Sequence, residues 1–458
     1  MSGPTAELAA WCAGLDLDDL PSTAVDRLGL LLLDHLGVAR LGATRPHHRT
    51  WAGVELGLCG GGPCRVLGQQ RRTSVDRAAF LNGMAGSSGP NLDDVWHGSL
   101  GHPGVGTWPA ALAVGELVEA DGRALLEAGA VGYEVAMRIG TAVGRSAFER
   151  GWHPRGGCNT PAAAVAALKV RGERDPGVYA AAIGLAANAA AGVVGAAYFS
   201  DAWYALSGHA SREGVLAADA ARAGLSATEE PLGGPRGYLA ATSAEPNPDA
   251  LTAGLGSTDP LLLEAGQKLY PSSGATHAAL ESAVSALRGL AADADDIASV
   301  RIDGFREMVD VLGQPFPANG LAATMSTPYV VACGLVEGTF ALRHLEDRFR
   351  EDARIRTLQA AIALHVDPRL DDLPPAHLGA RTTITTTDGR SATVEVLSAS
   401  GHPGNPLSRR QVLDKLHDLY RDGDLSDPPD LTALADTCED PTRATVVDVL
   451  DLVHHTTG

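Results

Sequence analysis

The sequence has few basic residues, and lysine is almost absent, with three lysines in 458 residues. Lys and Arg together number 36 against 55 Asp and Glu, which gives a net charge of −19 at pH 7. Phosphate backbones and anionic membrane surfaces are bound by clustered positive charge. The composition therefore argues against nucleic-acid and membrane partners.

Cysteine is also scarce, and the six cysteines are scattered along the chain. Such spacing is typical of a reducing compartment rather than of a disulfide framework. Cys59 and Cys64 lie close together, but no His or Cys pair nearby completes a zinc pattern. The N-terminus has no basic region followed by an apolar one, as a signal peptide would. We therefore expect a cytoplasmic protein without a metal site.

The sequence has no strongly hydrophobic run. Residues 180–199 are long enough for a membrane span, but they are mostly Ala and Gly and include Asn188. This composition predicts a buried helix that packs closely through small residues. A Gly-x-Ser-x-Gly elbow, a phosphate loop and a dinucleotide fingerprint are also missing in the required context.

What the sequence does contain is a series of helical patterns. Ser22 and Thr23 precede apolar residues at three- and four-residue spacing, which predicts a capped helix that ends at Gly37. The further predicted helices are residues 109–120, 123–146, 160–170, 176–195, 209–223, 276–290, 408–420 and 445–454.

Strand patterns are confined to one region. Residues 299–302, 381–387 and 391–397 are predicted strands, and Asp388-Gly389 is a hairpin signal between the last two. The length favours two domains. The predicted fold is mostly α: a large all-helical domain, residues 1–264 plus 402–458, with an inserted smaller α+β lid domain, residues 265–401. A cleft between them is the expected ligand site.

The first candidate cluster is a Gly-rich loop with two aspartates and two histidines. Asp93 and Asp94 are more simply explained as helix caps than as catalytic groups. His102, flanked by Gly101 and Pro103, favours acid–base chemistry because imidazole titrates near neutral pH.

Four further residues are candidates, each with a structural alternative. His153 lies in a Gly- and Pro-rich loop that is equally consistent with a surface turn, and Lys268 lies at the expected domain junction, where it stabilises an enolate or is merely solvated. His277 shares a helical face with Leu280, which is typical of a buried core histidine, and a catalytic role is the alternative. Tyr329 is a core aromatic or a phenol proton donor.

The order of these and other short motifs makes the chain similar to a known family. The motifs are residues 33–37 (Leu-Asp-His-Leu-Gly), 82–83 (Asn-Gly), 92–94 (Leu-Asp-Asp), 102–103 (His-Pro), 109–110 (Pro-Ala), 132–135 (Gly-Tyr-Glu-Val) with Arg138, 151–154 (Gly-Trp-His-Pro), 268–271 (Lys-Leu-Tyr-Pro) with His277, Tyr329, and 405–408 (Asn-Pro-Leu-Ser). In this order they resemble the MmgE/PrpD family, the 2-methylcitrate dehydratase-like lyases, over nearly the whole chain.

The resemblance implies a helical domain with a smaller lid, a homodimer, and no metal or organic cofactor. The family includes 2-methylcitrate dehydratases, cis-aconitate decarboxylases and an iminodisuccinate epimerase. Their shared chemistry is proton transfer next to a carboxylate or carbonyl group.

Four positions depart from the family pattern. Asn91 stands where relatives have an acid, and Val95 stands where they have threonine. Trp203 replaces a basic residue, and Arg155 replaces a common threonine. Loss of a cation and an acid with gain of an indole predicts a larger, less charged substrate. The predicted substrate-binding residues are Asn91, Asp93, Val95, Trp96, Arg155, Trp203 and Tyr270.

The prediction is a cofactor-independent lyase that dehydrates a β-hydroxy carbonyl compound, such as a polyketide-like metabolite whose enone product undergoes Michael-type cyclisation. His102 and His153 are the predicted acid and base in unassigned order, with Lys268 at the enolate and Tyr329 or His277 assisting proton delivery. The alternatives are a decarboxylase or epimerase of small polycarboxylates and a catalytically inactive binding protein.

Overall fold

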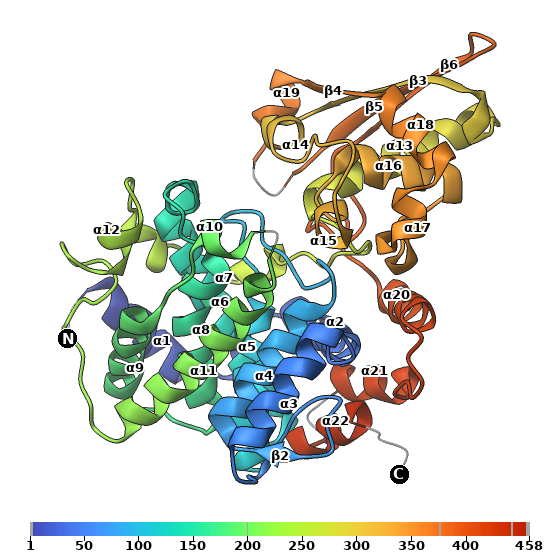
Figure 1. Cartoon of the computed structure of the whole chain (residues 1–458). Helices are drawn as coiled ribbons and strands as arrows, with labels where there is room; N and C mark the ends of the chain where they lie inside the picture. Colours follow the sequence, from blue (N-terminus) through green and yellow to red (C-terminus); the bar gives the residue numbers. More distant parts are fainter. Residues whose placement is uncertain (1–2, 199, 375–376, 441–442, 455–458) are drawn as a thin grey trace.

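The computed structural model describes residues 3–198, 200–374, 377–440 and 443–454, and it is mostly helical, as the sequence predicts. Figure 1 shows a large helical body and a smaller body that contains the main sheet. The last helices of the chain return to the large body beside α2. Among the described residues, no helix is both long and apolar enough to cross a membrane.

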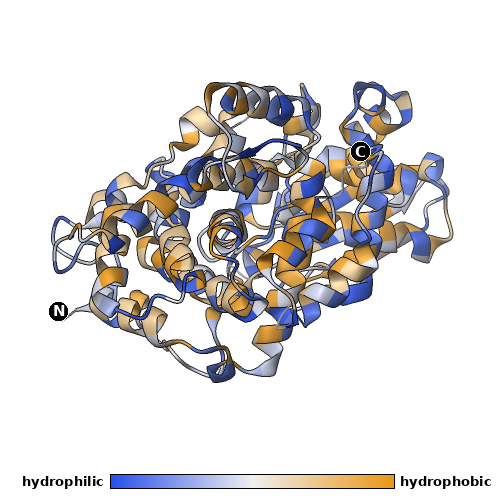
Figure 2. Cartoon of the chain, turned by 90° about the horizontal axis from the view of Figure 1, so that it is seen from below, coloured by the Kyte–Doolittle hydropathy of each residue, from blue (hydrophilic) through white to orange (hydrophobic). Residues whose placement is uncertain are grey.

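The large body is built from both ends of the chain. Its helices are α1 (Pro4–Gly14), α2 (Ser22–Gly42), α3 (Pro46–Leu58), α4 (Val75–Ser88), α5 (Gly104–Leu117), α6 (Gly122–Glu149), α7 (Pro154–Gly157), α8 (Asn159–Val170), α9 (Pro176–Ala189), α10 (Val194–Ala197), α11 (Ala202–Arg222), α12 (Tyr238–Thr242), α20 (Arg409–Asp422), α21 (Leu431–Glu439) and α22 (Val446–Val453). Strands β1 (Cys64–Arg65) and β2 (Arg72–Thr73) form a short antiparallel pair. In Figure 2, apolar and polar residues alternate along these helices, as expected for a packed bundle.

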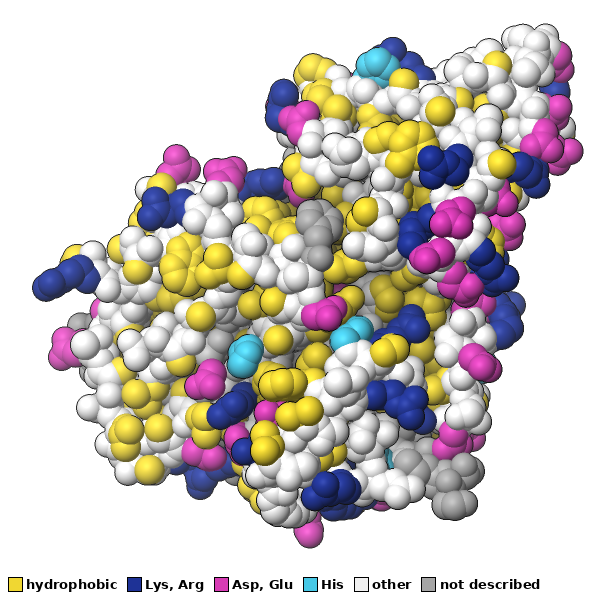
Figure 3. Space-filling view, viewed as in Figure 1, with side chains coloured by type: hydrophobic (Ala, Val, Ile, Leu, Met, Phe, Trp, Pro, Cys, Tyr) yellow, Lys and Arg dark blue, Asp and Glu magenta, His cyan; other side chains and the backbone are white. Residues whose placement is uncertain are grey.

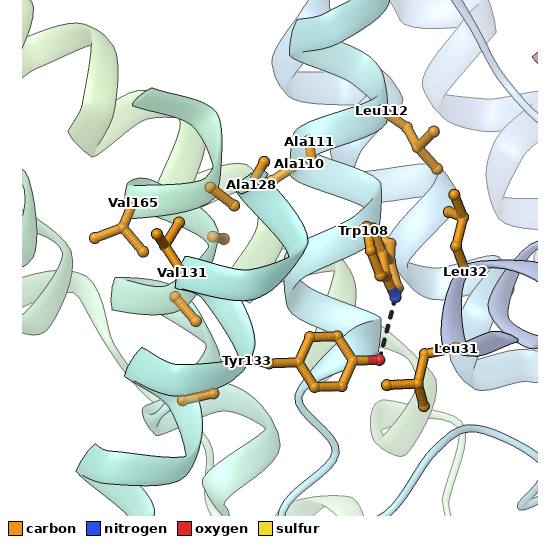
Figure 4. Packing of buried hydrophobic residues seen from close by; sticks show 14 of the residues in the cluster. Leu31, Leu32, Trp108, Ala110, Ala111, Leu112, Ala128, Val131, Tyr133 and Val165 are labelled. Atoms are coloured by element: carbon orange, nitrogen blue, oxygen red, sulfur yellow. Dashed lines mark hydrogen bonds between the residues drawn. The ribbon is translucent and has the colours of Figure 1, made fainter. Parts of the chain in front are cut away.

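Small residues let the helices of this body pack closely. A Cβ atom at Gly129 would lie 2.2 Å from the Trp108 ring, and one at Gly132 would lie 2.2 Å from Thr107. Trp108 donates a hydrogen bond of 3.1 Å to the Tyr133 hydroxyl in the resulting core (Figure 4). The close packing of α5 against α6 holds the loop before α5 in place, and that loop carries the first candidate cluster.

The smaller body has a separate hydrophobic core, whose buried members run from Ala275 to Ala399. Its elements are α13 (His277–Leu290), β3 (Ile297–Gly304), α14 (Arg306–Asp310), α15 (Gly320–Ala323), α16 (Thr327–Glu337), α17 (Asp347–Arg350), α18 (Ala353–Ala361), β4 (Ile362–Val366), α19 (Pro368–Asp371), β5 (Ala380–Thr386) and β6 (Ser391–Val396). The strand order is β4-β3-β5-β6, with β3 and β4 parallel and the other pairs antiparallel. We call this body the lid.

The helices predicted to start at residues 109 and 209 begin earlier, at Gly104 and Ala202. Two predicted C-terminal helix ends are also wrong, and both of these errors have a tertiary cause. Helix α2 does not end at Gly37 but continues to Gly42, because Gly37 provides space for α20: a Cβ there would lie 2.4 Å from Leu416. The helix predicted over residues 176–195 ends at Ala189 and resumes as α10. Between them Gly192 accepts a hydrogen bond of 3.0 Å from the His153 backbone, which fixes the second candidate loop.

Candidate active site

Asp93 is the centre of a buried group of charges that joins three distant segments. One of its carboxylate oxygens lies 2.7 Å from Arg155 Nη2 and 3.0 Å from His102 Nδ1, and the other lies 3.1 Å from Lys268 Nζ. Burial raises the pKa of Asp93, but the charges of Arg155, His102 and Lys268 outweigh burial and hold it well below its usual range. Asp93 is therefore an ionised residue that organises the site, not the helix cap expected from its sequence.

The segment that carries Lys268 is attached to the same loop by backbone hydrogen bonds. The Val95 N–H donates to the Gly266 carbonyl at 2.9 Å, and the Gly266 N–H donates back to Val95 at 2.6 Å. Gln267 accepts a side-chain hydrogen bond of 2.9 Å from Arg27. These contacts explain why Lys268, which lies 175 positions from Asp93 in the chain, reaches its carboxylate.

His102 presents a free basic nitrogen. Its Nδ1 lies 2.7 Å from the Asp94 carbonyl oxygen and 3.0 Å from the Asp93 carboxylate. Both neighbours accept hydrogen bonds, so Nδ1 carries the proton of the neutral ring and Nε2 keeps its lone pair. Burial, helped by the charge of Arg155, lowers the pKa of His102 to about 4, against the opposing effect of Asp93. The ring is therefore neutral at physiological pH, and its Nε2 can accept a proton.

His153 has the opposite tautomer. Its Nδ1 accepts a hydrogen bond of 3.0 Å from the Arg155 backbone N–H, so the proton of the neutral ring is on Nε2. Burial and then the charges of Arg155 and His102 lower the pKa of His153 well below its ordinary value. The centroids of the two imidazoles are 6.4 Å apart, and both rings line the same cavity. The site thus pairs an imidazole acceptor with an imidazole donor.

Arg155 lies behind this pair and does not line the cavity. Its guanidinium pairs with Asp93, donates a hydrogen bond of 2.8 Å to Ser87 Oγ, and stacks 4.4 Å from the Trp203 ring centroid. Trp203 contacts His153 edge-on at 4.8 Å. Arg155 and Asp93 were predicted to bind substrate, but the structure gives both a different place, in which they position the histidines and Lys268.

The cavity itself is small, about 60 Å³, and lies where the large body meets the lid. Three of the residues predicted to bind substrate, Asn91, Val95 and Trp203, line it. Of the described residues that line it, Lys268 alone carries a positive charge, and Glu307 alone is a carboxylate. The remaining described wall combines uncharged polar groups, three of them imidazoles, with apolar side chains such as Leu100 and Met325.

Four predicted site residues lie outside the cavity. Tyr329 is in the lid core, where its hydroxyl donates to the His344 carbonyl, and Tyr270 donates a hydrogen bond of 3.3 Å to Glu281. Trp96 packs inside the first loop and donates to Glu264 at 3.3 Å. His277 is buried behind the wall, without a hydrogen bond of normal geometry among the described residues. None of these four side chains lines the cavity, so we do not assign them a role in the chemistry.

Other residues enter the cavity that the sequence did not identify. They are His97, Leu100, Tyr198, Ser273, Gly274, Ala275, Glu307, Met325 and Leu378. His97 is the other histidine of the first candidate cluster, and Ser273 follows the motif at residues 268–271 by two positions, so proximity to a motif was an available signal. For the lid residues from Glu307 onward no motif indicates a site, because only the folding of the lid over the first loop brings them there.

Asp94 has the capping role that the sequence favours, with a partner outside its own segment. Its carboxylate accepts a hydrogen bond of 2.9 Å from the Gly104 N–H in the first turn of α5. Burial, and next the neighbouring charge of Asp93, raises the pKa of Asp94 to about 7. Asp94 thus holds the loop on α5, while Asp93 points to the cations.

Three buried histidines lie together behind Lys268 at the junction of the two bodies. His97 and His402 are 5.0 Å apart between ring centroids, and His402 and His277 are 6.2 Å apart. Burial lowers the pKa of all three imidazoles. Among the described residues, no group of three or more His, Cys, Asp or Glu is arranged to hold a metal ion.

Comparison with known proteins places this site in a family. Residues 6–251 match the MmgE/PrpD N-terminal domain, and residues 270–424 match the MmgE/PrpD C-terminal domain. The chain belongs to the MmgE/PrpD family. A cis-aconitate decarboxylase of Aspergillus terreus is 26% identical over 445 residues, covering 91% of this chain and 89% of its own length. A cis-aconitate decarboxylase-like protein, oryM, of Aspergillus oryzae is 25% identical over 442 residues, covering 91% and 90%.

As a member of the MmgE/PrpD family, a family of lyases, the chain is a divergent one. Two of the residues expected to depart from the family pattern are in contact, because the Arg155 guanidinium stacks on the Trp203 ring. Trp203 lines the cavity, whereas Arg155 lies one layer deeper and pairs with Asp93. The cation beside Asp93 is therefore separated from the cavity, and the wall at residue 203 is an indole.

Proposed function

We propose that the chain is a cofactor-independent lyase that removes the proton α to a carbonyl group and expels a β-hydroxyl as water. The observation that carries this proposal is the pair of opposite imidazole tautomers at one cavity. His102 offers a lone pair and His153 offers an N–H, and Lys268 adds a positive charge beside them.

The proposed reaction begins at His102. Its Nε2 takes the α-proton, and the resulting imidazolium is stabilised by Asp93, 3.0 Å from Nδ1. The carbonyl oxygen, which becomes the enolate oxygen, accepts hydrogen bonds from His153 Nε2–H and the Lys268 ammonium group. His153 acts as a hydrogen-bond donor and keeps its proton, since losing it would leave an imidazolate.

Elimination then restores the starting state. The enolate electrons form the α,β double bond, the bond to the β-hydroxyl breaks, and the leaving oxygen takes the proton from His102. The products are water and an α,β-unsaturated carbonyl compound, and His102 is neutral again. General acid–base catalysis of this kind contributes about 10²–10⁴-fold per group. An internal nucleophile of the product can add to the enone, which is how a polyketide-like substrate would cyclise.

Decarboxylation is the second candidate, favoured by the names of the relatives, which are cis-aconitate decarboxylases. Loss of carbon dioxide also gives an enolate-like intermediate, which the same three residues would stabilise and protonate. A tricarboxylate, however, brings about three negative charges, and burying each without a partner costs several kcal/mol. The single cation at the described cavity wall, Lys268, is already paired with Asp93. Epimerisation of a small polycarboxylate meets the same difficulty.

The decisive experiment measures proton exchange and product formation separately. The purified protein is incubated in D₂O with 3-hydroxyacyl thioesters and, in parallel, with cis-aconitate, citrate and 2-methylcitrate at millimolar concentration. We expect α-deuterium incorporation and alkene formation with the thioesters, both lost in His102→Ala, and negligible turnover of the three acids. Release of carbon dioxide from cis-aconitate at a normal enzymatic rate would replace this proposal by the decarboxylase. Absence of both exchange and turnover with every compound would favour a binding protein.

A further inference from the structure

A second and much larger cavity lies next to the catalytic one. It has a volume of about 800 Å³ and is lined by α6 and α10 on the side of the large body and by α14 and α19 on the side of the lid. Tyr198, Glu307 and Leu378 line both cavities. In Figure 3, hydrophobic side chains gather on the large body beside the notch beneath the lid. We call the larger cavity the vestibule and its three shared residues the neck.

We propose that the vestibule binds an uncharged, apolar extension of the substrate, so that the substrate is a β-hydroxy carbonyl compound with a long or cyclic hydrocarbon part. The identity of the reacting end rests on the function proposed above. The binding of the apolar part rests on the vestibule alone.

The two cavities differ greatly in volume. A cavity of about 60 Å³ has room for roughly two water molecules at about 30 Å³ each. It therefore holds a reacting end of a few atoms and no more, whereas pockets that bury whole drug-sized ligands measure about 300–1,000 Å³. The vestibule falls in that range. A substrate larger than its reacting end must extend through the neck.

A continuous aromatic wall connects the two cavities. The Phe148 ring lies 5.8 Å from His153 and 5.9 Å from Tyr198, with edge-on geometry in both pairs. Tyr198 in turn lies 5.3 Å from Trp203. The wall leads from the catalytic imidazole to the vestibule without a charged side chain among these four rings, and it suits a hydrocarbon rather than a chain of carboxylates.

The described wall of the vestibule has more acidic than basic groups. The described vestibule wall has four carboxylates, Glu149, Glu307, Asp310 and Asp371, and two guanidinium groups. Both guanidinium groups are already in ion pairs: Arg145 with Glu307 at 2.9 Å and Arg306 with Asp371 at 3.5 Å. An anionic extension would meet net negative charge and no unpaired cation of the described wall. Phe305, Val311 and Leu373 are among the apolar residues of the wall.

The test uses a ladder of saturated acyl N-acetylcysteamine thioesters of four to ten carbons. They lack the hydroxyl and cannot be dehydrated, so their affinity, measured by calorimetry, is independent of the reaction. We expect the affinity to rise about three- to fourfold for each added methylene. A terminal carboxylate on the ten-carbon compound should cancel most of that gain. The matching 3-hydroxyacyl compounds are assayed for turnover alongside.

The variant is Val311→Asp, because Val311 is 53% exposed and its side chain is not in the lid core. We expect the ratio of ten-carbon to four-carbon affinity to fall at least tenfold. The matched control is Val54→Asp on α3, a 46% exposed valine outside the vestibule wall, which should leave the ratio as in the parent protein.

The outcomes separate the two proposals. Affinity that is flat along the ladder, or a ratio that changes equally in Val311→Asp and Val54→Asp, would overturn the vestibule inference even if the hydroxyacyl compounds are dehydrated. Affinity that rises with chain length without any turnover would support the vestibule and overturn the dehydratase.

Discussion

The two halves of the site are built on opposite principles. On the side of the large body, Asp93 forms close ion-pair contacts with Arg155 and His102, and His153 is fixed by a hydrogen bond from the Arg155 backbone N–H. On the side of the lid, Ala275, Met325 and Leu378 are apolar wall residues, and Glu307 is the one carboxylate among the described residues of the wall. Lys268, in the segment between the two cores, is the link between the halves.

This difference indicates which body holds the reacting groups and which body determines substrate preference. A network of paired buried charges resists rearrangement, because moving any member leaves another charge without its partner. The large body therefore holds the reacting groups in place before a ligand arrives. An apolar wall can be changed without such a cost, and so the lid is the part in which substrate preference can change.

The largest effect expected is that of removing the shared carboxylate. Asp93→Asn leaves the buried Arg155 and Lys268 without their counter-charge, which destabilises a protein by about 3–5 kcal/mol. The contrasting variant is Asp303→Asn in the lid, whose partners Arg301 and Arg381 have side chains 56% and 39% exposed, and for which we expect about 1 kcal/mol or less. Denaturant unfolding measures both. Equal losses would mean that the two halves do not differ in this respect.

The next largest effect is expected on turnover, when the groups that contact the reacting atoms are removed. His102→Ala and Lys268→Ala should each reduce turnover at least about a hundredfold while the fold remains intact, since one removes the base and the other the charge beside the enolate. His417→Ala, on the exposed face of α20, is the control and should be fully active. Steady-state kinetics with circular dichroism decide the matter, and near-normal turnover in both folded variants would refute the mechanism.

A third prediction concerns acid sensitivity at the junction. Burial lowers the pKa of five imidazoles there, to about 4 for His102 and His402 and well below the ordinary value for His97, His153 and His277. In the unfolded chain these groups titrate near 6.5. Between about pH 6.5 and 4 the unfolded state therefore binds more protons, and the free energy of unfolding falls as the pH is lowered, by up to about 1.4 kcal/mol per pH unit for each group.

Asp94 opposes this trend, because its pKa is raised to about 7 and its protonation in the folded state favours folding at lower pH. The five histidines outnumber it, so net stability should drop steeply below pH 6.5. Urea unfolding at a series of pH values measures the slope, and His402→Gln on the lid side should make it shallower by about one group. Stability that is constant between pH 7 and 5 would show that these rings are not held neutral.

The sequence predicted which residues gather at the site better than it predicted which of them line the cavity and which lie behind its wall. The ordered motifs indicated His102, His153, Lys268, Asn91 and Trp203, and all five line one cavity. No local pattern reveals whether a side chain enters a cavity or the layer behind it.

For the same reason the predicted substrate contact Arg155 lies beneath an indole, and Tyr329 lies in the lid core. Helices followed from their apolar period, whereas the continuation of α2 past Gly37 and the end of α9 at Ala189 depend on contacts with α20 and with the His153 loop. These contacts are made by segments far away in the sequence, and no window of neighbouring residues contains them.

The smallest effect concerns the one charged contact described above that crosses the vestibule. Arg145 on α6 pairs with Glu307 on α14 at 2.9 Å, and the Arg145 side chain is 47% exposed. Exposed pairs of this kind contribute about 0–1 kcal/mol. We expect Arg145→Ala to change the free energy of unfolding by no more than that, and KM for a long-chain substrate by no more than about threefold, because the lid contacts the ligand mainly through apolar residues.

Salt provides the check on this last prediction. At about 1 M salt the screening length falls to about 3 Å, so the parent protein and Arg145→Ala should become indistinguishable. The control is Arg369→Ala, whose partner Glu395 lies within the lid, and which should leave KM unchanged at any salt concentration. A tenfold or larger rise in KM for Arg145→Ala alone would mean that a charged latch, rather than apolar contact, holds the lid over the substrate, and the contrast between the two halves of the site would then fail on the lid side.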